Sequence, residues 1–265
     1  MAGKASRIAI TLAVAMALAT APAGATTPAT PDGNGHPSVG ILVAEWLTPG
    51  VKDRICSGTL IAPRVFLTSA HCDVSFSGLP LDQYYVSFDP VYQFDSSTLY
   101  RGTFVPNASF IDYHNAGPTG RDPHDVAIVR LDQAPPVTPA TLPSEGLLSS
   151  LDLSQRSFTA VGYGRTRTDR TEGPNNIVNQ FARNTITQSF RNLFPAWLTL
   201  NGDPSTATNL TCYGDSGGPH FLGDSNVIVA LTATGDIPCG ALEVDYRLDT
   251  PSVRQYLAQQ GLTLP

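Results

Sequence analysis

Short apolar runs recur along the chain after residue 38, and turn-forming residues bound each of them. Each run has the length of a β-strand rather than of a helix. The chain has 23 glycines and 22 prolines without a Gly-X-Y period, which is typical of many turns between short strands. The pattern therefore predicts an all-β fold, with strands at residues 39–46, 58–62, 65–69, 84–88, 126–131, 158–163, 227–231 and 242–248.

The last segment is the one clear helix signal. Thr250 can cap its start, Pro251 fits the first helical position and Gly261 can end it. Three apolar side chains share one face by three- and four-residue spacing: Val253, Tyr256 and Leu257. We expect this C-terminal helix to dock on the core.

Prolines divide the chain near its middle. Residues 134–143 contain four of them, and proline cannot donate a ladder hydrogen bond, which disfavours a central strand there. We predict an N-terminal arm at residues 26–38, a first β half at 39–138, and a second β half with the helix at 139–265.

The first 25 residues have the pattern of a secretory signal peptide. Basic Lys4 and Arg7 precede the apolar run 8–19, and small residues end at Ala25. A membrane anchor is the alternative, but the run is well short of the roughly 20 residues that cross a bilayer. We expect a secreted, extracellular protein with no membrane association after the leader is removed.

Composition narrows the class of partner. Hydrophobic residues make up 42% and charged residues 14% of the 265 positions, which favours a compact core. Losing Lys4 and Arg7 with the leader changes the net charge from −6 to −8, and an acidic surface repels phosphate backbones. We therefore do not expect nucleic-acid binding.

The cysteine count indicates disulfides. Four cysteines in an oxidising compartment favour two bridges, with three possible connectivities that spacing alone cannot distinguish. Zinc is the competing interpretation, but the sequence has no Cys-x-x-Cys pair and no two histidines three to five residues apart. We expect no metal and no cofactor. The cysteines are Cys56, Cys72, Cys212 and Cys239.

The most informative stretch is residues 214–219, which read Gly-Asp-Ser-Gly-Gly-Pro. A serine nucleophile needs a tight bend that exposes its hydroxyl and aims backbone N–H groups at a developing oxyanion. Ser216 is the candidate nucleophile, and the N–H groups of Gly214 and Ser216 are the candidate oxyanion hole. The alternative is an ordinary glycine-rich turn.

A serine nucleophile also needs a base and an acid that orients it. His71 directly follows an apolar run and precedes Cys72, while Asp125 opens the apolar run 126–131. Taken alone, His71 is more often a structural histidine and Asp125 a solvated strand-start residue. The remaining histidines have the surroundings of exposed loop or turn residues: His36, His114, His124 and His220.

Taken together, these blocks resemble those of the trypsin- and chymotrypsin-like serine proteases. Residues 56–61 and 67–72 are similar to the family's histidine block, 125–131 to its aspartate strand and 214–219 to its serine block. The order His, Asp, Ser is the one that chymotrypsin has. The resemblance extends from about residue 39 to the C-terminal helix.

The resemblance implies a fold and a bonding pattern. It implies two packed six-stranded antiparallel β-barrels with the cleft between them, His71 and Asp125 coming from the first and Ser216 from the second. It also implies disulfides between Cys56 and Cys72 and between Cys212 and Cys239.

The sequence departs from the family at the start of the mature chain. Active members usually begin with Ile-Val-Gly-Gly, whose ammonium pairs with the aspartate before the serine, and no such sequence is present. Cleavage after Ala25 would instead expose Thr26. We therefore expect another cation beside Asp215, an exposed Asp215 or a badly formed oxyanion hole.

The predicted specificity pocket contains Leu210, Thr211 and Gly235. Leu210 stands where trypsin-like members carry the acid that binds Lys or Arg, so we expect a neutral floor and an apolar or small P1 residue. Glu243 or Asp245 could instead approach the pocket and favour a basic residue.

The predicted function is that of a monomeric, secreted serine endopeptidase acting on protein or peptide substrates by acyl transfer. Because the base must be neutral, kcat/KM should rise with pH through roughly 6 to 7. One alternative is an inactive binding or regulatory protein on the same fold, and another is a β-rich structural protein.

Overall fold

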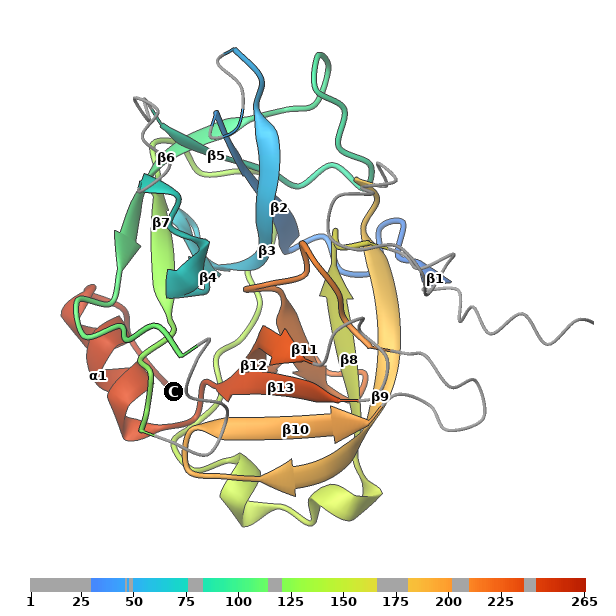
Figure 1. Cartoon of the computed structure of the whole chain (residues 1–265), viewed down its shortest axis with the longest axis vertical. Helices are drawn as coiled ribbons and strands as arrows, with labels where there is room; N and C mark the ends of the chain where they lie inside the picture. The colour runs from blue at the N-terminus through green and yellow to red at the C-terminus, as the bar shows by residue number, and fades with distance from the viewer. Residues whose placement is uncertain are drawn as a thin grey trace, which may run out of the picture.

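The computed structural model describes residues 30–45, 47, 50–75, 83–113, 121–165, 181–201, 210–235 and 242–265. Within them the chain forms two antiparallel β-barrels and one C-terminal α-helix (Figure 1). The predicted signal peptide lies outside the described residues. Among the described residues, no helix is long and apolar enough to cross a bilayer.

The first barrel closes through six strands in the order β2-β3-β4-β7-β6-β5. Every neighbouring pair is antiparallel, and short connections join β2 to β3 and β3 to β4. The strands are β2 (Val39–Ala44), β3 (Asp53–Ala62), β4 (Val65–Thr68), β5 (Tyr84–Ser87), β6 (Tyr100–Pro106) and β7 (Ala127–Leu131).

The second barrel has the order β9-β10-β13-β12-β11-β8 and closes where β8 pairs with β9. A short strand, β1 (Thr30–Pro31), pairs with the start of β9, on the side that β10 occupies further along the strand. The strands are β8 (Ser157–Gly162), β9 (Asn184–Leu193), β10 (Trp197–Asn201), β11 (Pro219–Leu222), β12 (Ile228–Gly235) and β13 (Glu243–Arg247). The predicted architecture of two six-stranded barrels is confirmed.

In the described part of the chain, three 3₁₀-helices lie outside the strands. They are η1 (Ala70–Cys72), which follows β4, and η3 (Leu148–Ser150) and η4 (Leu153–Gln155), which precede β8. The proline-rich segment lies between β7 and β8, and within it Ala140 N–H donates to the carbonyl of Leu60 on β3. The domain limit at residues 138 and 139 stays a prediction.

Every apolar run predicted as a strand overlaps one. The sequence pattern missed five strands because they lack a long apolar run: β1, β6, β9, β10 and β11. In β9, polar side chains occupy most positions, and several of them face solvent. Pairing with β8 and β10 on its two sides fixes β9 in the barrel despite that composition.

The C-terminal helix α1 (Pro251–Gln259) forms as predicted. The hydroxyl of Thr250 accepts the N–H of Val253, and Gly261 after the helix has a φ of +80°. The hydroxyl of Tyr256 donates to Val105 O at 2.6 Å on β6 and accepts Ile128 N–H on β7. The helix that ends the chain therefore docks on the first barrel (Figure 1).

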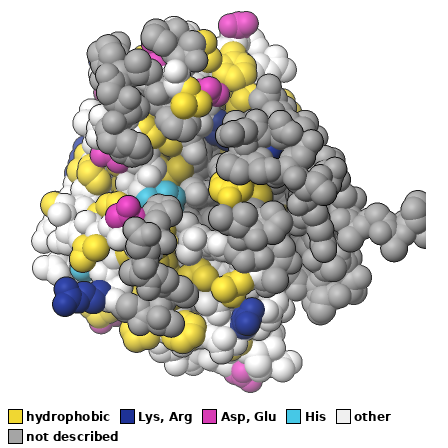
Figure 2. Space-filling model, viewed as in Figure 1, with side chains coloured by type: hydrophobic (Ala, Val, Ile, Leu, Met, Phe, Trp, Pro, Cys, Tyr) yellow, Lys and Arg dark blue, Asp and Glu magenta, His cyan; other side chains and the backbone are white. Residues whose placement is uncertain are grey.

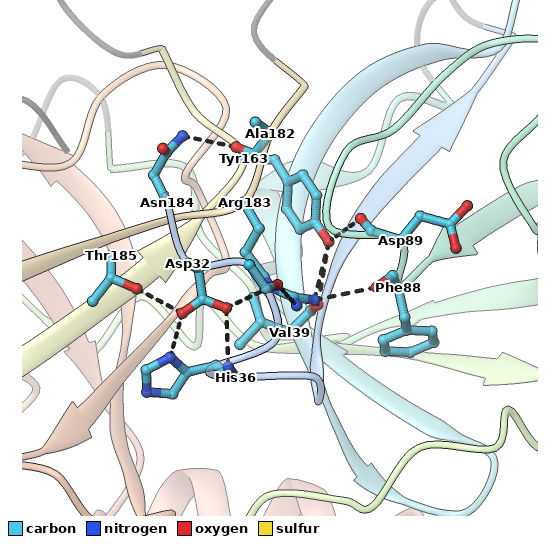
Figure 3. Close-up of polar contacts among 11 residues, drawn as sticks. Asp32, His36, Val39, Phe88, Asp89, Tyr163, Ala182, Arg183, Asn184 and Thr185 are labelled. Carbon is cyan, nitrogen blue, oxygen red and sulfur yellow. Dashed lines mark hydrogen bonds and ion pairs between the residues drawn. The ribbon is translucent and has the colours of Figure 1, made fainter. Parts of the chain in front are cut away.

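Arg183, just before β9, joins the arm to both barrels (Figure 3). Its Nε lies 2.8 Å from Oδ2 of Asp32, and its Nη1 donates to Val39 O and Phe88 O. Its fully buried side chain also approaches the hydroxyl of Tyr163. One guanidinium thus links the arm, the first barrel and the second barrel.

One face of the molecule shows how charge is distributed over the described residues. On the face drawn in Figure 2, charged side chains of both signs are few and scattered, and hydrophobic ones form small groups among polar residues. This distribution agrees with the low fraction of charged residues in the sequence.

Candidate active site

His71 lies on η1, directly after β4 of the first barrel. Cys72 is bonded to Cys56 on β3, so a disulfide ties the short helix to the barrel wall. This pairing is the one that the family resemblance implies. Cys212 is also disulfide-bonded, and its expected partner Cys239 lies outside the described residues.

Asp125 precedes β7 and holds His71 in one orientation. Its side chain is fully buried; Oδ1 accepts the backbone N–H of His71 at 2.9 Å, and Oδ2 lies 2.8 Å from His71 Nδ1. Because a carboxylate only accepts hydrogen bonds, this contact places the imidazole proton on Nδ1 and leaves Nε2 as an acceptor. Asp125 is therefore buried, and it is not the solvated strand-start residue that its position alone would favour.

Tyr113 is a second partner of Asp125 that the sequence analysis missed. Its hydroxyl donates to Asp125 Oδ2 at 2.9 Å, and its ring lies edge-on to that of His71. Tyr113 comes from a region that matched no specific motif, and a lone tyrosine there carries no sequence signal.

Charge coupling across this pair decides the protonation states. Burial disfavours the imidazolium, but the charge of Asp125 and its hydrogen bond outweigh burial and raise the pKa of His71 above 6.5. Burial likewise opposes ionisation of Asp125, yet the charge and hydrogen bonds of His71 lower the pKa of that carboxyl. The pair is therefore built to stabilise a protonated imidazole.

The serine block forms the tight bend that the glycines predict. Gly214 and Gly217 have φ values of +98° and +73°, a region that favours glycine. A Cβ at Gly217 would lie 2.1 Å from Oγ1 of Thr68 on β4, so the bend packs directly against the first barrel.

The bend places Ser216 beside the segment that carries His71. The carbonyl of Ser216 accepts the N–H of Ser57 at 2.9 Å and lies 3.9 Å from Sγ of Cys72, the residue after His71. The Ser216 residue is half-buried. Within the described part of the chain, the N–H groups of Gly214 and Ser216 donate to no protein acceptor, unlike those of Asp215 and Gly217.

Asp215 is buried, which excludes the expectation that it is exposed. Its carboxylate accepts the N–H of Gly164 at 2.7 Å and of Cys212 at 2.9 Å. Burial raises its pKa to about 6, against the opposing effects of these hydrogen bonds and of the charge of Arg54. Arg54 is a second residue that the sequence analysis did not single out.

The predicted pocket residues lie on neighbouring segments. Leu210 is buried, and Gly235 at the end of β12 pairs with Glu243 on β13. Thr211 donates its N–H and hydroxyl to the buried carboxylate of Glu243, at 3.1 and 2.5 Å. Glu243 therefore lies behind Thr211, with its oxygens already occupied.

His220 is not the exposed turn residue that its neighbours suggested. It is fully buried on β11, where Nε2 lies 2.9 Å from Oδ1 of Asp245 and 3.3 Å from Oε1 of Glu243. Burial disfavours its charge, but the two carboxylates raise its pKa to about 10. The prediction failed because β11 is a central strand of the second barrel and its acidic partners come from β13.

Two groups of described residues come close enough to suggest metal ligation. In one, Cys56 and Cys72 are joined in the disulfide and have no thiolate to offer. In the other, the Nε2 of His220 is already occupied by Asp245 and Glu243. Neither group presents an uncommitted set of ligands.

The family model described as Trypsin matches residues 33–251. Kallikrein 1-related peptidase b8 of Mus musculus is 30% identical over 207 residues, covering 71% of this chain and 73% of that protein. Melanization protease 1 of Drosophila melanogaster is 29% identical over 228 residues, covering 74% of this chain but only 55% of that protein. The chain thus spans little more than half the length of that relative.

Solved structures show the same fold. HL collagenase superposes with a TM-score of 0.66 at 18% identity, covering 89% of this chain and 99% of that one. Neuropsin, a serine protease of mouse brain, gives a TM-score of 0.64 at 17% identity, covering 87% and 96%. With a family match over most of its length and the paired barrels of these structures, the chain belongs to the trypsin family of chymotrypsin-like serine proteases.

Proposed function

We propose that the protein is a secreted serine endopeptidase with His71, Asp125 and Ser216 as its catalytic triad. The observation that carries the proposal is the hydrogen-bonded pair of His71 and a fully buried Asp125, on a segment packed against the Ser216 bend. Family membership supports peptide-bond hydrolysis, and the relatives named above are a peptidase and a protease.

The first half of the reaction forms an ester. Nε2 of His71 takes the proton of the Ser216 hydroxyl as its oxygen attacks the peptide carbonyl, and Asp125 stabilises the resulting imidazolium. The N–H groups of Gly214 and Ser216 stabilise the oxyanion of the tetrahedral intermediate. When the C–N bond breaks, His71 donates the proton to the leaving amine.

The second half reverses these roles with water. His71 removes a proton from water, the hydroxide attacks the acyl ester, and the carbonyl oxygen again draws on the two N–H groups. The C–O bond to Ser216 breaks, the serine recovers its proton and a carboxylic acid leaves. No cofactor takes part in this sequence.

We assign the specificity pocket to Leu210, Thr211 and Gly235, with a preference for an uncharged P1 side chain. Glu243 is 1% exposed and its carboxylate is committed to Thr211, Gln188 and His220, so it offers no free charge to a basic substrate. Peptides that differ only at P1 test this preference, and faster cleavage after Lys or Arg would contradict it.

We assign the protein to the extracellular space, with residues 1–25 as the leader. The disulfide between Cys56 and Cys72 supports an oxidising compartment. N-terminal sequencing of the protein recovered from culture medium tests both the export and the cleavage position.

A fluorophosphonate probe tests the activity itself. We expect it to label Ser216 in the folded protein and to lose that label in Ser216→Ala, while Ser225→Ala, at an exposed turn serine, keeps it. A folded wild type that takes no label would favour the inactive, ligand-binding alternative.

A further inference from the structure

Asp215 lies where an uncompensated charge is costly. Its carboxylate sits between Gly162 and Gly164, where a Cβ at either position would come within 2.1 Å of its oxygens. Two backbone N–H groups reach it, but a buried carboxylate also calls for a cation. The residue is next to Ser216, so its position controls the bend that carries the nucleophile.

Arg54 on β3 contacts both segments that enclose this carboxylate. Its buried guanidinium donates from Nη1 to the carbonyl of Tyr163 at 2.8 Å. Tyr163 stands between Gly162 and Gly164, the two glycines that enclose the Asp215 carboxylate. It also covers Gly214, where a Cβ would lie 2.6 Å from its Cζ and Nε. The Cζ of Arg54 also lies over the ring of Phe181, 5.7 Å from its centroid.

The electrostatic effects agree with this placement. The charge of Arg54 lowers the pKa of Asp215 against burial, whereas Glu243 raises it. Burial lowers the pKa of Arg54, and Asp215 and Asp53 raise it while Arg165 lowers it. Arg54 is therefore placed so that its charge acts on Asp215.

The same strand holds the bend through a second residue. Ser57 donates its hydroxyl to Gly214 O at 2.8 Å, accepts the N–H of Tyr163 and donates its own N–H to Ser216 O. These neutral hydrogen bonds fix the backbone, but they do not neutralise a carboxylate. A positive charge beside Asp215 is therefore still needed.

We propose that Arg54 is a positioning residue for the oxyanion hole: its charge neutralises Asp215 while its guanidinium packs on Gly214. The proposal rests on the proposed function, because it assumes that Gly214 and Ser216 hold an oxyanion. If so, the cation beside Asp215 is a side chain of the first barrel and not the ammonium at the start of the chain. A charged chain start is then not required for an ordered bend.

The test compares Arg54→Met with Arg54→Lys, and with Arg101→Met, an exposed arginine on the same barrel, as the matched control. Loss of one oxyanion donor lowers turnover by about 10²–10³-fold, so we expect Arg54→Met to lower kcat by about 10- to 100-fold with KM changed less than about threefold. Arg54→Lys should recover most of kcat because it keeps the charge. Wild-type kcat in Arg54→Met, or equal losses in Met and Lys, would overturn the proposal.

A readout independent of turnover separates this proposal from the proposed function. The Asp215 carboxyl can be titrated by NMR, with Asp215→Asn to assign its signal, and Arg54→Met should raise its pKa from about 6 by at least about one unit. An unchanged pKa contradicts the proposal even if the wild type has no activity. Where Arg54→Met alone does not fold, Arg54→Met with Asp215→Asn should fold, because the uncompensated charge is gone; failure of that double variant would count against the charge role.

A chain-start ammonium is one rival cation, because a small cavity bordered by Gly162, Gly164, Arg165 and Asp215 lies beside the carboxylate. We would compare a form that begins at Thr26 with one that carries three additional residues before it. The proposal expects equal kcat for the two forms. Loss of kcat on extension, restored when the extension is removed, would assign the charge to the ammonium instead.

Discussion

Arg183 and Asp32 form a buried ion pair that attaches the N-terminal arm to the second barrel, with Nε 2.8 Å from Oδ2 (Figure 3). The same carboxylate accepts the backbone N–H of His36 and the hydroxyl of Thr185. Because Arg183 also reaches Val39 and Phe88 of the first barrel, the pair links all three parts of the molecule.

Asp32→Asn should therefore destabilise the fold. Removing one partner of a buried pair leaves the other charge uncompensated, and we expect a loss of about 3 kcal/mol in the free energy of unfolding at pH 7. Urea denaturation followed by tryptophan fluorescence measures it. Asp132→Asn, which breaks an exposed pair with Arg101 at 3.7 Å, is the control and should change stability by less than about 0.5 kcal/mol.

The effect of Asp32→Asn should also depend on pH. Burial opposes ionisation of Asp32, but hydrogen bonds from His36 and Thr185 outweigh it and hold its pKa well below the usual 3.8. Such a group stabilises the fold fully above its unfolded pKa, and this contribution is lost as pH falls toward its folded pKa. The difference between wild type and Asp32→Asn should shrink steadily below about pH 4; a constant difference from pH 7 to 2.5 would contradict the ionic role.

The His71 and Asp125 pair sets the acidic side of the pH profile. Since Asp125 raises the pKa of His71 above 6.5, kcat/KM should reach half its maximum above that pH, and falling pH removes the base by protonating it. Asp125→Asn should lower kcat by about 10⁴-fold, because the asparagine no longer stabilises the imidazolium or fixes its tautomer. A profile that is flat from pH 5 to 8 would remove His71 from the mechanism.

The disulfide between Cys56 and Cys72 supports the base as well as the fold. It closes a loop with a sequence separation of 16 residues, for which chain-entropy arguments give about 3 kcal/mol. We expect the double variant Cys56→Ala with Cys72→Ala to lose about that much stability. Its folded form should also have a lower kcat than the wild type, because η1 carries His71. Equal kcat in the folded double variant would show that β4 and Asp125 suffice to place the imidazole.

Sequence reasoning located the parts of the site that carry local signals. The apolar run before His71, the run that Asp125 opens and the glycines around Ser216 each occupy consecutive positions, so their elements could be predicted. Tyr113 contacts Asp125 at a sequence separation of 12, and Arg54 contacts Tyr163 at a separation of 109. Each looks like an ordinary residue among its sequence neighbours. No local pattern could identify them.

His220 illustrates the same limit more sharply. Next to Gly218 and Pro219 it has the sequence surroundings of a turn, yet it lies fully buried within strand β11. Its burial is tolerated because β13 places Glu243 and Asp245 against it, a register that depends on strand pairing between β12 and β13. Proximity in sequence gave no indication of these two partners.

His220→Gln should be among the most destabilising single changes. The imidazolium lies between two buried carboxylates, and its loss leaves their charges facing one another; we expect a loss of about 3–5 kcal/mol near neutral pH. Because the folded pKa of His220 is raised to about 10, its contribution is complete below about 6.5 and disappears as pH rises through 10. His124→Gln, at a half-buried histidine 3.8 Å from Asp122, is the control and should have little effect.

Combining His220→Gln with Asp245→Asn tests whether charge, rather than shape, causes the loss. Among the described residues, His220 is the group whose contact favours the ionised form of Asp245, and burial raises the pKa of Asp245 to about 7. Replacing it by the neutral amide removes the repulsion from Glu243, so the double variant should recover at least about half of the lost stability. Additive losses in this double-mutant cycle would mean that His220 stabilises the barrel by filling space, and that the buried charges are compensated by other groups.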